Sequence, residues 1–213
     1  MKFGVIGLGR FGNDVATLLA ENGMEVLAVD DNESIVNSIR DYVTQAICMR
    51  ITDEASLRSI GMDEMETVIV AMGENIAQSI LITALLKKRL NIKKVITRAV
   101  SEIHKEILTL VGADQVILPE KEVGIHLADR LSSPFIDLVR ITKNFSISQL
   151  IAPKKFVGKT VKELELFENY QVYCIGLNMG DDITPIDPEY IIATADRLVF
   201  SGNRENLEMI TKL

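Results

Sequence analysis

Three glycines near the start of the chain, Gly7, Gly9 and Gly12, form the pattern G-x-G-x-x-G. An apolar run at residues 3–6 precedes the pattern and a helical pattern follows it, which predicts a strand, a tight turn and a helix. In such a unit the first glycine allows the turn, the second lets backbone approach a phosphate, and the third lets the helix pack closely. The free N–H groups at the start of the helix attract anions. This segment therefore predicts a site for a dinucleotide or an adenine nucleotide.

An acidic residue follows at the distance that this kind of site requires. The apolar run at residues 26–29 ends on Asp30, about 20 residues beyond Gly9, with Asp31 beside it. A carboxylate there can accept hydrogen bonds from both ribose hydroxyls, and its charge repels a 2′-phosphate. We therefore expect an unphosphorylated ribose, which disfavours NADP.

Composition narrows the classes of function. The 213 residues are 47% hydrophobic, which is enough for one large domain or for a medium and a small one. With 23 basic and 30 acidic residues the net charge is −7, which argues against a nucleic-acid partner. No apolar run approaches the roughly 18 residues of a membrane span, and the early first strand leaves no room for a signal peptide. We expect a cytoplasmic protein in which Cys48 and Cys174 are buried free thiols.

The first part of the chain alternates strands and helices. Six apolar segments, each followed by a helical pattern, predict a Rossmann-like doubly wound parallel sheet. These segments are residues 3–6, 26–30, 45–49, 67–72, 94–98 and 115–118. We predict a nucleotide-binding domain over residues 1–135, which ends in a helix after Glu120.

A small α+β domain is predicted over residues 136–213. Strands are expected at residues 145–152, 171–179, 182–186 and 197–202, with short helices from Gly158 and Glu205. The second and third of these strands would form a hairpin around Gly180 and Asp181. A module of this size without glycine loops or histidine ligands is more typical of a sensor or a dimerisation unit than of a catalytic half.

No catalytic group stands out in the sequence. Hydride transfer needs a proton donor beside the cofactor, but His104 is expected on the surface side of its helix's apolar stripe and His126 lies among apolar residues. The segment Gly158-Lys-Thr160 lacks the earlier glycine that a P-loop requires. A nucleotide site without catalysts predicts that the nucleotide is a signal and that the protein is not an enzyme. An NAD-dependent oxidoreductase and an NAD(H)-sensing redox regulator remain the alternatives.

Several segments taken together carry a family resemblance. They are residues 6–12 (Ile-Gly-Leu-Gly-Arg-Phe-Gly), 27–30 (Leu-Ala-Val-Asp), Gly112-Ala-Asp114, 119–124 (Pro-Glu-Lys-Glu-Val-Gly), 158–164 (Gly-Lys-Thr-x-x-Glu-Leu), and Asp196-x-Leu198 followed by Gly202. With them the chain resembles the regulatory subunits of Ktr/Trk-type bacterial potassium transport systems. The first domain resembles an RCK domain (regulator of potassium conductance, TrkA-N type), and the second resembles its TrkA-C companion.

The resemblance implies a cytosolic gating ring. Dimers would assemble into an octameric ring that docks on a membrane potassium-translocating subunit at the inner face of the cell membrane. ATP or ADP, and NAD(H) in some members, would bias the shape of the ring. Several members also bind Mg, Ca or Na at the phosphates. Some bind cyclic di-AMP in the second domain, where Ile175, Asn178 and Pro185 would be wall residues.

The resemblance also implies a set of binding residues. Besides Gly7, Gly9, Gly12, Asp30 and Asp31, the set contains Arg10, Phe11, Arg50, Ile51, Ala71, Gly73, Glu74, Asn75 and Arg98, with Glu120 as a cation ligand. Arg10 lies inside the phosphate loop, where a guanidinium can reach outer phosphates. Arg98 would either meet a γ-phosphate across a dimer interface or be a surface cap. Glu120 would either hold a cation or be an ordinary acid at a helix N-terminus. Arg50 departs from the Asn or Asp that the family often carries there.

The helix after Glu120 carries Val123, Leu127 and Leu131, and Phe135 follows soon after. This apolar surface is larger than one short helix needs. In the family that the chain resembles, this helix crosses to a partner subunit, whereas the residues alone equally allow it to pack on its own sheet.

Overall fold

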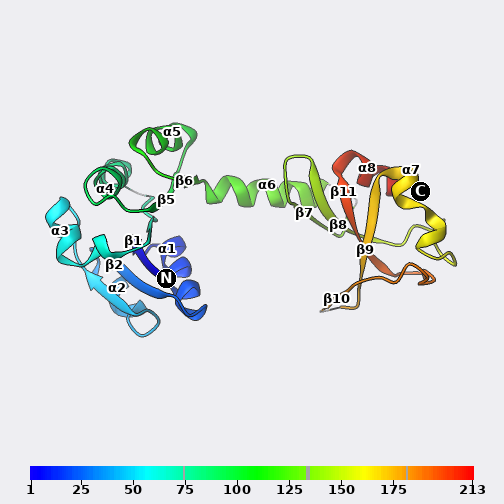
Figure 1. Cartoon of the computed structure of the whole chain (residues 1–213), viewed down its shortest axis with the longest axis horizontal. Helices are drawn as coiled ribbons and strands as arrows, with labels where there is room; N and C mark the ends of the chain where they lie inside the picture. The colour runs from blue at the N-terminus through cyan, green and yellow to red at the C-terminus, as the bar shows by residue number, and fades with distance from the viewer. Residues whose placement is uncertain (74, 133–134, 181) are drawn as a thin grey trace. The chain divides into compact units, whose positions relative to one another are not determined.

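The computed structural model describes residues 1–73, 75–132, 135–180 and 182–213. The chain divides into two compact units, Met1–Lys121 and Glu122–Leu213. Helix α6 (Pro119–Ser132) begins in the first unit and continues into the second (Figure 1). The domain boundary predicted at residue 135 comes after this helix, whereas the division between the two units along the chain falls after Lys121, in the first turn of the helix.

A six-stranded parallel sheet forms the middle of the first unit and confirms the predicted Rossmann-like fold (Figure 1). Its strand order, β3-β2-β1-β4-β5-β6, is that of a doubly wound dinucleotide-binding sheet. The strands are β1 (Lys2–Ile6), β2 (Glu25–Asp30), β3 (Gln45–Cys48), β4 (Thr67–Val70), β5 (Lys94–Arg98) and β6 (Gln115–Ile117). The order reverses between β1 and β4, and ligands of such sheets bind at the carboxyl ends of the strands beside that point.

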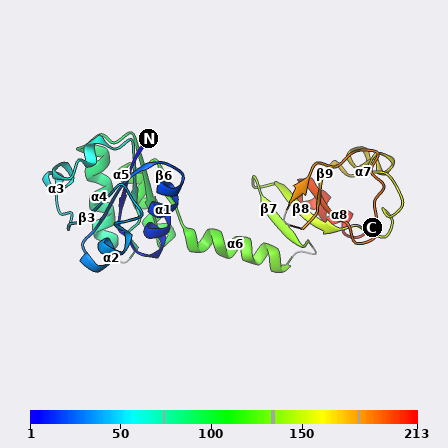
Figure 2. The same cartoon turned by 90° about the horizontal axis from the view of Figure 1, so that it is seen from below.

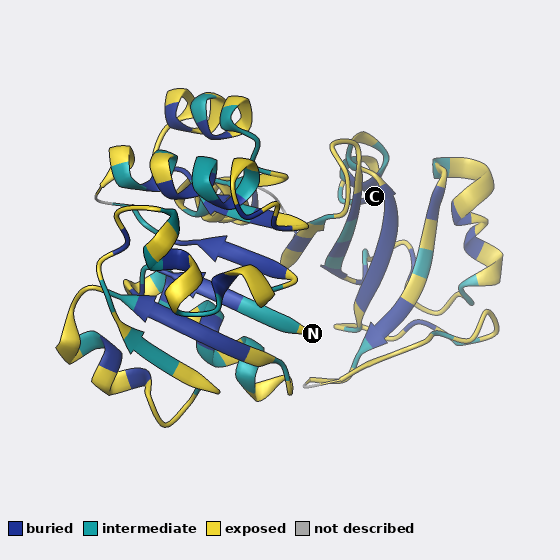
Figure 3. Cartoon of the chain, turned by 60° about the vertical axis from the view of Figure 1, so that its left-hand side comes forward, coloured by how far each residue is buried: buried dark blue, intermediate teal, exposed yellow. Residues whose placement is uncertain are grey.

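Helices cover both faces of this sheet, and the central strands β1, β2 and β4 are mostly buried (Figure 3). The helices are α1 (Arg10–Glu21), α2 (Glu33–Ile39), α3 (Glu54–Ser59), the 3-10 helix η1 (Met62–Glu64), α4 (Ile76–Lys88) and α5 (Glu102–Val111). Helices α1 and α2 share one hydrophobic cluster, and α3, η1 and α4 share another on the opposite face. All four residues of β4 are buried, as expected for a strand with helices on both sides.

The Gly112-Ala-Asp114 segment has a structural role between α5 and β6. Gly112 ends α5 in the left-handed region, with φ at +109°. The Asp114 carboxylate then accepts hydrogen bonds from the Val95 backbone N–H at 2.6 Å and from Lys87 Nζ at 2.9 Å. Both bonds tie the start of β6 to β5 and α4, so this segment stabilises the sheet.

The structure corrects two expectations about burial. His104 is buried rather than on the surface side of its helix, because it shares the inward face of α5 with Leu108. Its Nδ1 accepts a hydrogen bond from the Val100 backbone N–H. Cys48 is exposed rather than buried, since it is the last residue of the edge strand β3. Cys174 is half-buried, and burial raises the pKa of its thiol to about 12.

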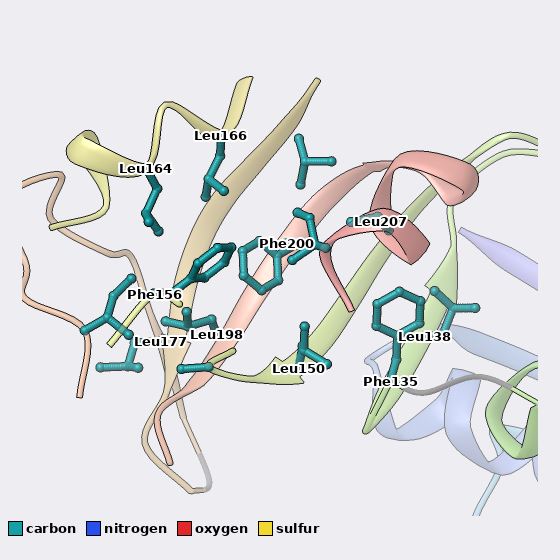
Figure 4. Packing of buried hydrophobic residues seen from close by; sticks show 14 residues of the cluster. Phe135, Leu138, Leu150, Phe156, Leu164, Leu166, Leu177, Leu198, Phe200 and Leu207 are labelled. Carbon is teal, nitrogen blue, oxygen red and sulfur yellow. The ribbon is translucent and has the colours of Figure 1, made fainter. Parts of the chain in front are cut away.

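A five-stranded antiparallel sheet, ordered β10-β9-β11-β8-β7, forms the second unit and confirms the small α+β domain. Its elements are β7 (Asp137–Arg140), β8 (Phe145–Ile151), the 3-10 helix η2 (Lys162–Leu164), α7 (Leu166–Tyr170), β9 (Val172–Asn178), β10 (Ile183–Thr184), β11 (Arg197–Asn203) and α8 (Arg204–Ile210). Figure 2 shows helices α7 and α8 in the same unit as these strands, and Phe200 of β11 lies in the core that joins both helices to the strands (Figure 4). Strand β7 was missed in the sequence because Leu138 is its one buried residue. Pro134 and the predicted turn residue Asp181 lie outside the described residues.

Asp129 is the buried residue of α6. Its carboxylate forms ion pairs with Arg140 of β7 and with Arg204 of α8, the second at 3.1 Å. The Arg140 guanidinium, and then that of Arg204, lowers the pKa of this carboxyl. The cluster therefore fixes the last turns of α6 to the second unit.

Among the helices of the described residues, none has both the length and the apolar character that crossing a membrane requires.

Candidate functional site

The glycine-rich turn is held between the carboxyl ends of β2 and β4. Ile6, the last residue of β1, pairs with Val29 on one side and with Val70 on the other. The Gly7 backbone N–H donates to the Val29 carbonyl at 2.8 Å, and the Ala71 N–H donates to the Ile6 carbonyl at 2.8 Å. The turn is therefore fixed at the edge of the sheet where ligands bind.

Each glycine of the pattern has its own steric role, which follows from what a Cβ at that position would meet. Gly7 has φ at +90°, and a Cβ there would come within 2.8 Å of Met72 Cγ. A Cβ on Gly12 would overlap the Gly7 carbonyl oxygen, so the helix could not pack so closely. A Cβ on Gly9 would meet no atom within 4 Å. The space beside Gly9 is therefore open, in the place where the sequence predicts a phosphate.

The N-terminus of α1 offers free backbone donors. The N-cap residue is Gly9, and no side chain of the described residues caps this helix. The next four α-helices of the first unit are capped by the side chains of Asn32, Asp53, Asn75 and Ser101. The first N–H groups of an α-helix have no partner within the helix, and its dipole places positive potential there. This end of α1 is therefore suited to an anion.

Asp30 braces the glycine-rich turn as well as facing the site. Its Oδ2 accepts a hydrogen bond from the Leu8 backbone N–H at 2.7 Å, and its Oδ1 accepts one from the Asn32 N–H at 2.9 Å. Each carboxylate oxygen has a further lone pair. Asp30 can therefore hold the turn and still accept hydrogen bonds from ribose hydroxyls. The sequence predicted the second role and not the first.

A narrow cleft of about 30 Å³ lies beside Asp30. Its lining residues are Ile6, Gly7, Val29, Asp30, Asp31, Met49, Arg50, Ile51, Met72, Gln78 and Ile82. Five predicted site residues therefore meet here, namely Gly7, Asp30, Asp31, Arg50 and Ile51. The two methionines and the isoleucines give the cleft apolar walls, but its volume is too small to enclose a nucleoside.

Gln78 is a cleft residue that the sequence did not reveal. Its Nε2 donates to the Ile51 carbonyl at 3.1 Å, and its Oε1 accepts from Asn75 Nδ2 at 3.2 Å. The Asn75 Oδ1 in turn accepts from the Gln78 backbone N–H and caps α4. Gln78 thus joins the start of α4 to the loop that follows β3. The predicted contact Glu74 lies outside the described residues.

Arg10 does not share the cleft with Asp30. It is exposed in the first turn of α1 and borders an open hollow of about 520 Å³. The other lining residues are Leu8, Asn13, Asp14, Ile35 and Ser38. A further cavity of about 290 Å³, at the amino ends of β1 and β2, contains none of the predicted site residues.

Arg98, at the end of β5, connects three elements around the glycine-rich turn. Its guanidinium forms an ion pair with Glu120 in the first turn of α6. The guanidinium carbon lies 6.0 Å from the centroid of the Phe11 ring. A Cβ on Gly73 would come within 2.6 Å of Arg98 Nη1, so glycine leaves room for the Arg98 side chain in this position. The Arg98 side chain is 21% exposed, which is low for a surface cap.

The surroundings of Glu120 differ from those of a preformed metal site. Its own backbone N–H at the start of α6, and then the Arg98 guanidinium, lower the pKa of the Glu120 carboxyl. Within the described ranges, no three His, Cys, Asp or Glu side chains come together as a metal-binding group. A cation at Glu120 would therefore need further ligands, such as phosphate oxygens.

Comparison with known proteins identifies both halves of the chain. A family model described as the TrkA-N domain matches residues 3–119, and one described as the TrkA-C domain matches residues 148–213. The Ktr system potassium uptake protein A of Bacillus subtilis (strain 168) is 37% identical over 209 residues, which cover 97% of this chain and 94% of that protein. The Ktr system potassium uptake protein C of the same organism is 30% identical over 214 residues, which cover 99% and 96%.

Solved structures of GsuK share the fold. The GsuK channel bound to NAD matches with a TM-score of 0.55 at 23% identity, over 99% of this chain and 38% of the GsuK chain. GsuK bound to ADP matches with a TM-score of 0.54 at 25% identity, over 61% of this chain and 33% of that chain. This chain therefore spans well under half the length of these GsuK chains.

Proposed function

Because the chain belongs to the Ktr/Trk family of potassium uptake proteins with TrkA-N and TrkA-C domains, we propose that it is a nucleotide-sensing regulatory subunit of a bacterial potassium uptake system. The observation that carries the proposal is the uncapped N-terminus of α1 next to the Asp30 carboxylate. One binds phosphates and the other binds ribose, and both lie at the carboxyl edge of the sheet.

The residues present fit ATP, ADP or NAD(H). Phosphates would lie in the open space beside Gly9, on the free N–H groups of α1. Asp30 would accept the ribose hydroxyls and exclude a 2′-phosphate, and the nucleoside would lie at the mouth of the narrow cleft that Arg50 and Ile51 line, since the cleft is too small to enclose it. Arg10, Arg98 and a Mg, Ca or Na ion at Glu120 would read the terminal phosphate. The NAD-bound and ADP-bound forms of GsuK support ligands of this class.

We propose that the nucleotide acts as a signal and is not a substrate. The described lining of the cleft holds two carboxylates and one guanidinium, with no histidine, lysine or tyrosine to supply a proton near neutral pH. His104 is buried in α5 and is not among the residues that line the cleft. A ligand then changes the protein only through its different affinities for two conformations.

Exposed apolar residues support an assembly of several chains. Val123, Leu127 and Leu131 of α6 are exposed, the last by 78%. Leu110 of α5 is 82% exposed and Ile103 of the same helix is exposed too. Apolar groups gathered on helix surfaces in this way are typical of contacts between subunits. We propose that dimers join through α6, form an octameric ring, and dock in the cytoplasm on a membrane potassium-translocating subunit.

We propose that the second unit binds a second regulatory ligand. Ile175 and Asn178 lie on β9, and Pro185 follows β10, so the three residues belong to one hairpin. Ile175 and Pro185 are exposed. Cyclic di-AMP is the ligand that we propose for this surface.

Native mass spectrometry of the purified protein with ATP, ADP, NADH and NADPH tests the proposal. We expect an oligomer larger than a dimer that retains adenine nucleotides and excludes NADPH. A monomer that binds none of them would refute it. A clear preference for NADH over ATP would favour a redox regulator, and steady hydride turnover would favour an oxidoreductase.

A further inference from the structure

The Arg98 guanidinium occupies a position between the glycine-rich turn and the start of α6. It lies near Phe11 of α1, fills the space that Gly73 leaves open, and pairs with Glu120. The Arg98 side chain is mostly covered at 21% exposure, whereas that of Glu120 is 68% exposed. The cation is thus held in place by its surroundings, and its countercharge is the solvent-exposed partner.

Arg98 has hydrogen-bonding capacity to spare. Its Nη2 donates to Glu120, but its buried Nε has no acceptor among the described residues. Lys121, the neighbouring cation of α6, pairs with Glu102 and so does not compete with Arg98 for Glu120. Glu120 is therefore the carboxylate that the structure assigns to Arg98, and one further acceptor could still be bound.

A phosphate is a better partner for this guanidinium than an exposed carboxylate. It carries more negative charge and offers three acceptor oxygens, so it can engage two N–H groups of arginine at once. An exposed ion pair contributes little in water, since solvent screens it. A phosphate that reaches Arg98 should therefore displace Glu120.

We propose that Glu120 is an internal competitor for the nucleotide, and that the terminal phosphate takes its place on Arg98. The inference rests on the proposed function, since it needs a nucleotide at this edge of the sheet. Glu120 belongs to the first turn of α6 and Arg98 to the end of β5. Occupancy of the site thus decides whether α6 is tied to the sheet through this pair.

An internal competitor and a cation ligand predict different changes in nucleotide affinity when the Glu120 charge is removed. If Glu120 competes with the phosphate, then Glu120→Gln tightens nucleotide binding in the absence of divalent cations. If Glu120 only holds a cation, the same substitution weakens binding in Mg²⁺ and changes nothing in EDTA.

The test is calorimetric titration of the full chain with ATP and ADP in EDTA. Because the pair is exposed on one side, we expect Glu120→Gln to tighten the binding of at least one of the two by about two- to five-fold. Glu122→Gln removes the same charge from an exposed position on the same helix and serves as the matched control. We expect it to leave both affinities within about two-fold of the wild type.

Repeating the Glu120→Gln substitution in variants that lack the Arg98 guanidinium separates competition for Arg98 from a general effect of charge. In Arg98→Gln, and in Arg98→Met, which keeps an apolar chain against Phe11, the Glu120→Gln substitution should no longer tighten binding. A purely long-range effect would persist in both backgrounds and would overturn the proposal. Thermal unfolding of every variant establishes that each one is folded.

The possible results separate the two proposals. If the wild type binds ATP or ADP and Glu120→Gln binds neither more tightly, internal competition is wrong and the nucleotide-sensing function stands. If neither the wild type nor Glu120→Gln binds any nucleotide, both proposals fail. Binding that appears only in Glu120→Gln would support competition strongly.

Discussion

Substitution of Asp30 should separate the stability of the glycine-rich turn from nucleotide binding. In the structure its two oxygens accept hydrogen bonds from the backbone N–H groups of Leu8, at 2.7 Å, and Asn32, at 2.9 Å. Leu8 is only 2% exposed, so water replaces its lost acceptor less readily than that of Asn32, which is exposed. Asp30→Ala and Asp30→Asn therefore have different consequences.

The expected magnitudes follow from these contacts. Asp30→Ala leaves one buried N–H without a partner, which costs about 1–3 kcal/mol of the free energy of unfolding. Asp30→Asn keeps one oxygen for the Leu8 N–H, so the loss should stay below about 1 kcal/mol. Both variants lose charged acceptors for the ribose hydroxyls. Each should therefore bind ATP roughly 10- to 100-fold more weakly, the equivalent of one or two such hydrogen bonds.

Urea unfolding followed by circular dichroism measures the stability, and calorimetric titration measures the affinity. Asp31→Ala is the control, because this neighbour has the same charge and is exposed; its stability should change by less than about 0.5 kcal/mol. If Asp30→Ala is as stable as the wild type, the brace on Leu8 is wrong. If Asp30→Asn binds ATP as tightly as the wild type, the ribose assignment is wrong.

Three further predictions concern other parts of the molecule. Arg10→Ala should narrow the ratio of ATP to ADP affinity in calorimetry, since its guanidinium is proposed to reach the third phosphate; an unchanged ratio removes Arg10 from that role. Gly73→Ala should displace Arg98, because the new Cβ would come within 2.6 Å of Nη1; we expect weaker ATP binding with a stability loss below about 1 kcal/mol, and unchanged affinity would contradict this. Asp129→Asn should destabilise the protein by about 1–3 kcal/mol in urea at neutral pH. Because its pKa is lowered in the folded state, the Asp129 contribution is present above about pH 4 and is lost as the pH falls through the folded-state pKa. The two proteins should therefore become equally stable in acid, and a constant difference would contradict this assignment.

Much of the first unit could be predicted because its signals are local. Apolar runs marked the six strands, and Gly112 and Ser101 marked helix ends whose geometry depends only on neighbouring residues. The edge strand β7 was missed because its pattern spans four residues with a single buried side chain. His104 was misplaced because one histidine on a helix does not reveal which face packs inward.

The candidate site was predicted in part. Its glycines and Asp30 have fixed spacing, so they could be found without the structure. Gln78 could not, because it acts through the carbonyl of Ile51, which is distant in the chain. Cys48 likewise gave no sign that its strand is the edge of the sheet.

By itself, the sequence determined the order of strands and α-helices in the first unit, the glycine-rich turn and the acidic residue beside it, since periodicity and glycine conformation act over a few residues. Only the tertiary structure decided that Asp30 also holds Leu8, and that Arg98 is paired with Glu120 between Phe11 and Gly73. The physical reason is the parallel sheet. It brings the carboxyl ends of separate strands to one edge, where side chains far apart in the chain come within hydrogen-bonding distance.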